Sequence, residues 1–104
     1  MIAHYDDIAL VALVTSDPAR SDEFVQDTLG GLLTADQDIR DTVSTYISEQ
    51  CNTSRAAERL YTHRNTVIRK LARADELLPR PLPHNIVAVA TALEVVRWRG
   101  QQSA

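Results

Sequence analysis

A group of side chains suited to reading nucleic-acid bases stands in the middle of the chain. His63, Arg64 and Asn65 are consecutive, and Ile68 and Arg69 follow one helical turn later. An arginine can donate two hydrogen bonds to O6 and N7 of guanine, and an asparagine can pair with N6 and N7 of adenine. An isoleucine can pack on the methyl group of thymine. This base-reading group therefore points to recognition of base edges in double-stranded DNA.

A helix over residues 63–77 would present the base-reading group on one surface. Val67, Leu71, Ala74 and Leu78 are spaced four, three and four residues apart. This spacing is typical of the apolar stripe by which a helix packs on a core. The base-reading group then falls on the remaining surface of the helix, where it is free to meet a partner.

A shorter helix is predicted just before it, beginning at Thr53 or Ser54, either of which can cap it. Only Tyr61 and Thr62 separate the two helices, and we expect Thr62 to cap the second one. Small alanine side chains on the first helix would let the second cross it closely. Two helices joined by such a turn match helix-turn-helix geometry. The second helix of that motif enters the major groove with its N-terminus first.

Side chains suited to DNA phosphates surround this unit. Hydroxyl groups and free N–H groups at a helix start bind phosphate oxygens, and cationic side chains pair with them. The candidates for these contacts are Thr62, Thr66, Lys70, Arg73 and Arg55.

Charge is segregated along the chain of 104 residues, whose formal net charge is −3. Residues 1–50 carry two arginines against ten carboxylates, a net charge of −8. Residues 54–80 carry seven basic side chains against three carboxylates, a net charge of +4. A basic segment inside an acidic chain is typical of a nucleic-acid-binding surface. The alternative is that an arginine-rich helix is simply well solvated.

Helices are also predicted ahead of this unit. Residues 1–15 contain an apolar run that fits a buried strand or a buried helix, and we choose a helix. Asp17 can cap a second helix that starts at Pro18, a favoured first position. The Gly30-Gly31 pair is expected to end it.

The elements around the motif complete an all-α chain. Thr34 and Gln37 have the spacing of a capping box, which predicts a helix over 35–51. We expect Asn52 to end that helix in a left-handed conformation. Three prolines then precede a last, apolar helix over 84–99, ended by the following glycine. The chain is predicted to be an all-α helix-turn-helix DNA-binding domain of about five to six helices.

Other classes of function find little support in the sequence. His4, His63, His84 and Cys51 lack the spacing of metal ligands, so neither a metal nor a cofactor is expected. No nucleophile–base motif, phosphate loop or nucleotide fingerprint is present, so we expect no enzyme. No apolar run reaches the roughly 18 residues that a membrane span needs. A single cysteine fits a reducing, cytoplasmic environment.

The run AAERLYTHRNTVIRKL, residues 56–71, resembles the C-terminal helix-turn-helix domain of the PucR family of bacterial transcriptional regulators, also called the CdaR or sugar-diacid regulator type. The positions that carry the resemblance are Ala56, Ala57, Leu60, His63, Arg64, Asn65, Thr66, Val67, Lys70 and Leu71. Two positions depart from the family. Lys70 replaces an arginine, whose fork-shaped contact lysine does not reproduce, and Thr62 stands where a small apolar residue is more usual.

The resemblance implies a module of a larger regulator. Family members carry an N-terminal sensing region and a GGDEF-like middle region, so we expect the sensing domains to lie outside this chain. Residues 34–100 would be the DNA-binding domain. Residues 1–33 would be an acidic helical segment, the tail of a preceding domain or a linker.

The competing hypothesis is a helical protein-interaction or dimerisation module, with a homodimer formed through helix 84–99.

Overall fold

The computed structural model describes residues 16–103 and contains only helices in that part of the chain. Five α-helices and two short 3₁₀ helices follow one another: α2 (Pro18–Leu29), η1 (Gly30–Thr34), α3 (Gln37–Ser48), α4 (Thr53–Arg59), α5 (Arg64–Leu77), η2 (Leu82–His84) and α6 (Ile86–Ser103). The predicted all-α class is confirmed. The helix predicted within residues 1–15 lies outside the described residues.

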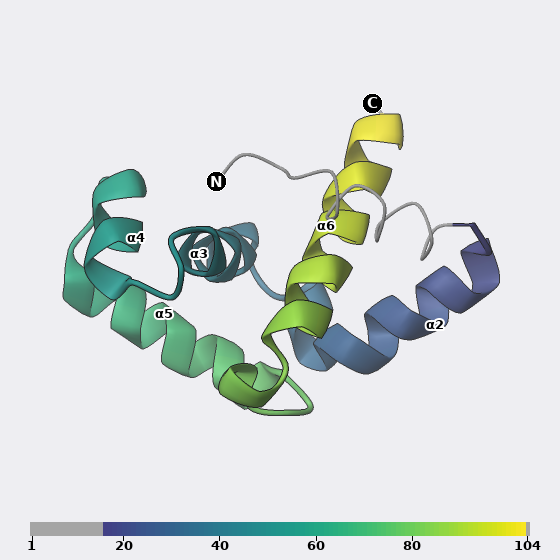
Figure 1. Ribbon diagram of the computed structural model, residues 1–104, viewed down its shortest axis with the longest axis horizontal. Helices are drawn as coiled ribbons and strands as arrows, with labels where there is room; N and C mark the ends of the chain where they lie inside the picture. Colours follow the sequence, from purple (N-terminus) through teal and green to yellow (C-terminus); the bar gives the residue numbers. More distant parts are fainter. Residues whose placement is uncertain (1–15, 104) are drawn as a thin grey trace.

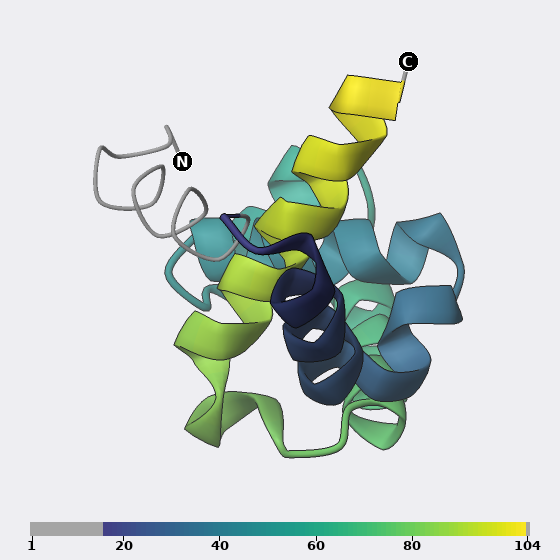
Figure 2. The same cartoon turned by 90° about the vertical axis from the view of Figure 1, so that its right-hand side faces the viewer.

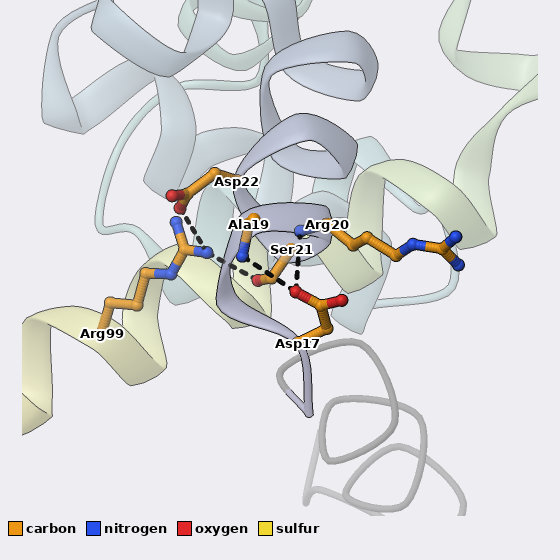
Figure 3. Close-up of polar contacts among 6 residues, drawn as sticks. All are labelled: Asp17, Ala19, Arg20, Ser21, Asp22 and Arg99. Atoms are coloured by element: carbon orange, nitrogen blue, oxygen red, sulfur yellow. Dashed lines mark hydrogen bonds and ion pairs between the residues drawn. The ribbon is translucent and has the colours of Figure 1, made fainter.

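Helix α2 begins where its local signals predict. The carboxylate of Asp17 accepts hydrogen bonds from the backbone N–H groups of Ala19 and Arg20, at 3.2 and 3.4 Å, and Pro18 opens the helix. Figure 3 shows a second contact at the same end of α2, where the Arg99 guanidinium of α6 lies against the first turn of the helix.

Arg99 joins the first and last described helices. Its guanidinium donates to the buried hydroxyl of Ser21 at 2.6 Å and lies 2.7 Å from a carboxylate oxygen of Asp22 (Figure 3). Hydrogen bonds to a charged donor are stronger than neutral ones. The contact therefore fixes α2 against α6 across 78 positions of sequence.

The predicted end of α2 at the Gly30-Gly31 pair is confirmed, whereas the predicted start of α3 is not. Gly30 has a φ of 51°, and a Cβ there would lie 2.8 Å from the Pro79 ring, so glycine is required. α2 therefore ends at Leu29, and the chain continues as the separate 3₁₀ helix η1. The predicted capping box is wrong, because the Thr34 hydroxyl faces the Gly31 carbonyl and Gln37 bonds to Asp41.

The end of α3 also corrects a prediction. Asn52 does not adopt the left-handed conformation; Gln50 and Cys51 do, with φ values of 58° and 60°. The N–H of Cys51 donates to the Tyr46 carbonyl and that of Gln50 to the Ile47 carbonyl, at 2.8 and 3.0 Å. This pair of bonds is a Schellman motif, with Gln50 at the position that glycine usually takes.

The chain after α5 is held by a side chain that the sequence pattern did not single out. The carboxylate of Asp75 accepts from the N–H of Leu82 at 3.0 Å and so fixes the proline-rich connection. The last helix starts two residues later than predicted and runs through Gly100 to Ser103. Gly100 does not end it, since a glycine inside a helix costs free energy without forbidding the helix.

Figures 1 and 2 show how the helices surround a common core. α6 crosses α2 on one side, whereas α3, α4 and α5 form the other side. Fully buried side chains from four elements meet between them: Leu29, Leu32, Val43, Val89 and Val95. α2 therefore shares the core of the following helices, while the boundary proposed between residues 33 and 34 stays a prediction.

None of the helices in the described part of the chain combines the length and apolar character that crossing a membrane would need.

Candidate nucleic-acid interface

α4 starts one residue earlier than its predicted caps suggest. Asn52, rather than Thr53 or Ser54, occupies the cap position, and its side-chain oxygen accepts from the N–H of Arg55 at 2.9 Å. Asparagine is among the best residues for this position. The cap leaves the exposed Arg55 side chain on the first turn of α4.

The other end of α4 is tied to α3. Arg59 donates to a carboxylate oxygen of Glu49 at 2.8 Å, and this hydrogen bond lowers the pKa of Glu49. The pair fixes the helix that leads into the turn, and it removes Arg59 from the basic side chains available to a ligand.

The turn between α4 and α5 is a second Schellman motif. The N–H of Thr62 donates to the Ala57 carbonyl at 3.0 Å, and that of Tyr61 donates to the Glu58 carbonyl at 3.2 Å. Tyr61 has a φ of 54° and so takes the left-handed position. The prediction that Thr62 caps α5 is wrong: His63 holds the cap position, and its side chain makes no capping hydrogen bond.

α4 and α5 cross over a small apolar cluster. Ala56 and Ala57 of α4 and Val67 of α5 are buried together, with exposures of 0, 4 and 0%. A larger side chain at either alanine would separate the helices, because interhelical distance depends on the side chains at the contact. This cluster sets the angle at which α5 is presented.

α5 divides into a buried and an exposed side, as its periodicity predicts. Val67 and Ala74 are buried and Leu71 is half-buried against the core. The exposed side chains include five of the predicted contacts: Arg64, Asn65, Ile68, Arg69 and Arg73. His63 is exposed just before the helix, and Thr62 and Thr66 are half-buried. The structure therefore brings the base-reading group together on one face.

The basic side chains of α5 differ in what they contact. Lys70 is half-buried and pairs with Asp38 of α3 at 3.0 Å, whereas Arg73 pairs with the exposed Glu76 at 2.9 Å. Within residues 16–103, Arg64 and Arg69 form no ion pair. Two guanidinium groups on the exposed face thus keep their hydrogen-bonding capacity for a ligand.

The turn between α4 and α5 also holds an exposed aromatic residue that the predicted site does not include. Tyr61 is 97% exposed, although it stands in the turn and carries an aromatic ring. The signal was present in the sequence: the short connection between the helices contains no glycine. A non-glycine residue therefore had to take any left-handed position there.

The Lys70–Asp38 pair gives a prediction for acid. Its hydrogen bond is the main cause that lowers the pKa of the Asp38 carboxyl below 3.8. The pair therefore stabilises the fold above pH 3.8, and this contribution is lost as the pH falls through the lowered pKa. Asp38→Asn should lower the midpoint of urea unfolding slightly at pH 7, with no difference from the parent well below that pKa. Lys70→Met removes the other partner of the same pair and should give the same pattern, and an equal loss at both pH values in either variant would contradict the assignment.

No group of His, Cys, Asp and Glu side chains among the described residues is placed to hold a metal ion. The chemistry of this face is that of hydrogen-bond donors, cations and one exposed apolar side chain.

The crossing of α4 and α5, the tight turn and the supporting helix α3 define a helix-turn-helix domain. Residues 39–95 match the PucR C-terminal helix-turn-helix domain family, and the chain belongs to this family. The resemblance seen in the sequence is confirmed.

A curated relative supports the same assignment. The chain is 41% identical over 64 residues to the purine catabolism regulatory protein of Bacillus subtilis (strain 168). The aligned part is 60% of this chain but only 12% of the length of that relative. No solved structure matches the chain.

Proposed function

We propose that this chain binds double-stranded DNA sequence-specifically, as the DNA-reading module of a bacterial transcriptional regulator. Helix α5 would lie in the major groove, with His63, Arg64 and Asn65 leading. Ile68 and Arg69 would follow one turn further along the groove. Residues 34–100 would form the module, and the sensing domains would lie elsewhere in the full-length protein.

The observation that carries this proposal is the chemistry of the exposed face of α5. Arg64 and Asn65 are exposed side by side, and Arg64 is not paired to a carboxylate of the described residues. A guanidinium bound to an acidic neighbour would have to give up that contact before reaching guanine. Membership of a helix-turn-helix family supports the same use of the face.

The remaining predicted contacts fit a supporting role. Arg55 on α4 and Arg73 on α5 are exposed and Thr66 is half-buried, and we expect all three to contact phosphates. The start of α5 has no side-chain cap, so its first backbone N–H groups are available to a phosphate oxygen. Lys70 is expected to contribute less than the others, because it is half-buried as well as paired with Asp38, whereas both partners of the Arg73–Glu76 pair are exposed and such a pair is weak.

The first test is binding to duplex DNA as salt is varied. We expect log K to fall linearly with log salt concentration, by about 0.9 per phosphate neutralised. Arg73→Ala should reduce that slope by about 1 and weaken selected and scrambled duplexes alike. Fluorescence anisotropy with a duplex selected from a random pool gives both quantities. Absence of binding to any duplex at low salt would refute the proposal.

The second candidate function, a dimerisation or protein-interaction module, draws on the surface of α6. Val87 is 71% exposed and Trp98 is 45% exposed, on a helix whose side between them is buried or half-buried. They are separated by about three helical turns, on nearly the same side. Phe24, Pro83 and Ile86 line an open groove beside Val87.

Light scattering of the chain with and without duplex separates the two candidates. A dimer without DNA affinity at low salt would favour the second candidate, whereas a monomer that binds duplex would favour the first. The two are compatible, because a dimer would meet half-sites about 34 Å apart on the duplex.

A further inference from the structure

We propose that Tyr61 contacts the sugar-phosphate backbone of DNA, with its phenol hydroxyl donating a hydrogen bond to a phosphate oxygen beside the start of α5. This inference rests on the proposed function and adds a contact to it. Tyr61 would contribute to affinity for every duplex and not to the choice between base sequences.

The backbone at Tyr61 is in a conformation that disfavours its side chain. Its φ of 54° places it at the left-handed position of the Schellman motif that ends α4. Glycine usually takes this position, because a Cβ there approaches the following carbonyl oxygen. The local geometry of the turn therefore gives no reason for a tyrosine.

Packing gives no reason for it either. The Tyr61 side chain is 97% exposed and belongs to neither apolar cluster of the described residues. Tyr46, by contrast, is half-buried and packs against both clusters. A large aromatic residue that is strained at its backbone and contributes nothing to the core calls for a role outside the fold.

The position of Tyr61 indicates what that role is. It stands two residues before His63 and three before Arg64, in the short connection between α4 and α5. Figure 1 shows this connection at the left edge of the molecule, directly above the first turn of α5. When α5 enters the groove with its N-terminus first, the connection meets the rim of the groove, where the phosphates are.

Tyrosine suits that place chemically. Its hydroxyl is a donor, and tyrosine is among the side chains that bond to phosphate oxygens. Its ring is rigid, with only two side-chain torsions, so that little conformational freedom is lost on contact. The ring also offers an apolar face to the deoxyribose.

The test uses three variants of the whole chain, measured against a duplex selected by the parent and a scrambled duplex of equal composition. Tyr61→Gly should raise Tm by a few degrees by relieving the backbone, and should raise Kd for both duplexes about three- to tenfold. Tyr61→Phe should leave Tm unchanged and raise Kd for both about threefold, since only the hydroxyl is lost.

Gln50→Gly is the matched control. Gln50 is exposed and occupies the same left-handed position at the end of α3, with a φ of 58°. Its replacement should raise Tm like Tyr61→Gly and leave Kd unchanged, which separates relief of the backbone from loss of a contact.

Three results would overturn the inference. The first is an unchanged Kd for Tyr61→Gly. The second is parental affinity of Tyr61→Phe, which would exclude the hydroxyl as donor. The third is a loss of self-association of the Tyr61 variants on light scattering while their Kd for DNA stays that of the parent, which would assign Tyr61 to a contact with a second copy of the chain. Failure of the parent to bind any duplex at low salt would instead refute the proposed function, and this inference with it.

Discussion

Replacement of Arg64 by alanine is expected to weaken the preference for a selected duplex markedly while leaving the fold intact. The side chain is exposed and forms no ion pair within residues 16–103, so its removal creates neither a cavity nor an unpaired buried charge. A two-bond contact to guanine contributes about 1–3 kcal/mol of discrimination. The ratio of Kd for the scrambled duplex to Kd for the selected duplex should then be about 10- to 100-fold smaller in the variant than in the parent.

Asn65→Ala should have a similar effect at a different base pair. Asn65 stands next to Arg64 at the leading end of α5 and has the two groups that pair with adenine. Selection from random duplexes with each variant should relax one position of the binding site per variant. Relaxation of the same position by both would contradict the assignment of separate bases.

Arg20→Ala is the control for charge. Arg20 is an exposed arginine near the start of α2, outside the helix-turn-helix (Figure 3). Its loss changes the net charge of the chain as much as the loss of Arg64. We expect it to leave the ratio of the two affinities unchanged. If Arg64→Ala behaved like Arg20→Ala, the exposed face of α5 would not be the reading surface.

The start of α2 and the two sides of α5 could be predicted from the sequence, because interactions between residues close in the chain determine them. The start of α2 follows from Asp17 and Pro18, since a cap involves only residues within one turn. The two sides of α5 follow from the spacing of Val67 and Ala74, since periodicity fixes which residues share a face. These features depend on neighbours in the chain and on nothing distant.

The wrong predictions concern caps, where several nearby groups compete for the same helix end. Thr34 has the chemistry of a cap, but the Arg40 guanidinium donates to the Leu33 and Ala35 carbonyls and holds that connection instead. Thr62 has it too, but the turn that ends α4 places His63 at the cap position of α5 and leaves Thr62 one residue before it. The type of a residue indicates whether its side chain can cap a helix, but the path of the backbone determines which residue occupies the cap position.

Contacts between helices far apart in sequence were also beyond prediction. The pairing of Lys70 with Asp38 joins α5 to α3, and Arg99 joins α6 to α2. The sequence pattern does not indicate whether Lys70 and Arg99 face solvent, DNA or a carboxylate of another helix. Only the packing of the helices determines which carboxylates lie within reach.

Leu29→Ala is expected to cause the largest loss of stability among the variants considered. Leu29 is completely buried, in the core that α2 shares with α3, α5 and α6. Replacing a buried leucine by alanine costs about 2–5 kcal/mol, against a total of about 5–15 kcal/mol for a domain. Tm should fall by roughly 10 °C or more for a chain of this size.

The same variant tests whether α2 belongs to one cooperative unit with the helix-turn-helix. If it does, thermal unfolding followed by circular dichroism and by Trp98 fluorescence should show a single shifted transition. Two transitions, of which only one shifts, would place α2 in a separate unit and would favour a domain boundary between residues 33 and 34.

Gln26→Ala provides the control on the same helix. Gln26 is exposed, and its backbone carbonyl, which accepts from the N–H of Gly30, is retained in the variant. Its effect should remain within about 0.5 kcal/mol. The Leu29→Ala variant should also keep its DNA affinity. At a temperature where Leu29→Ala is still folded, the affinity of this variant for the selected duplex should equal that of the parent, because Leu29 is buried and contributes nothing to the exposed face of α5. A loss of affinity there would mean that the core at Leu29 also sets the angle at which α5 meets the groove.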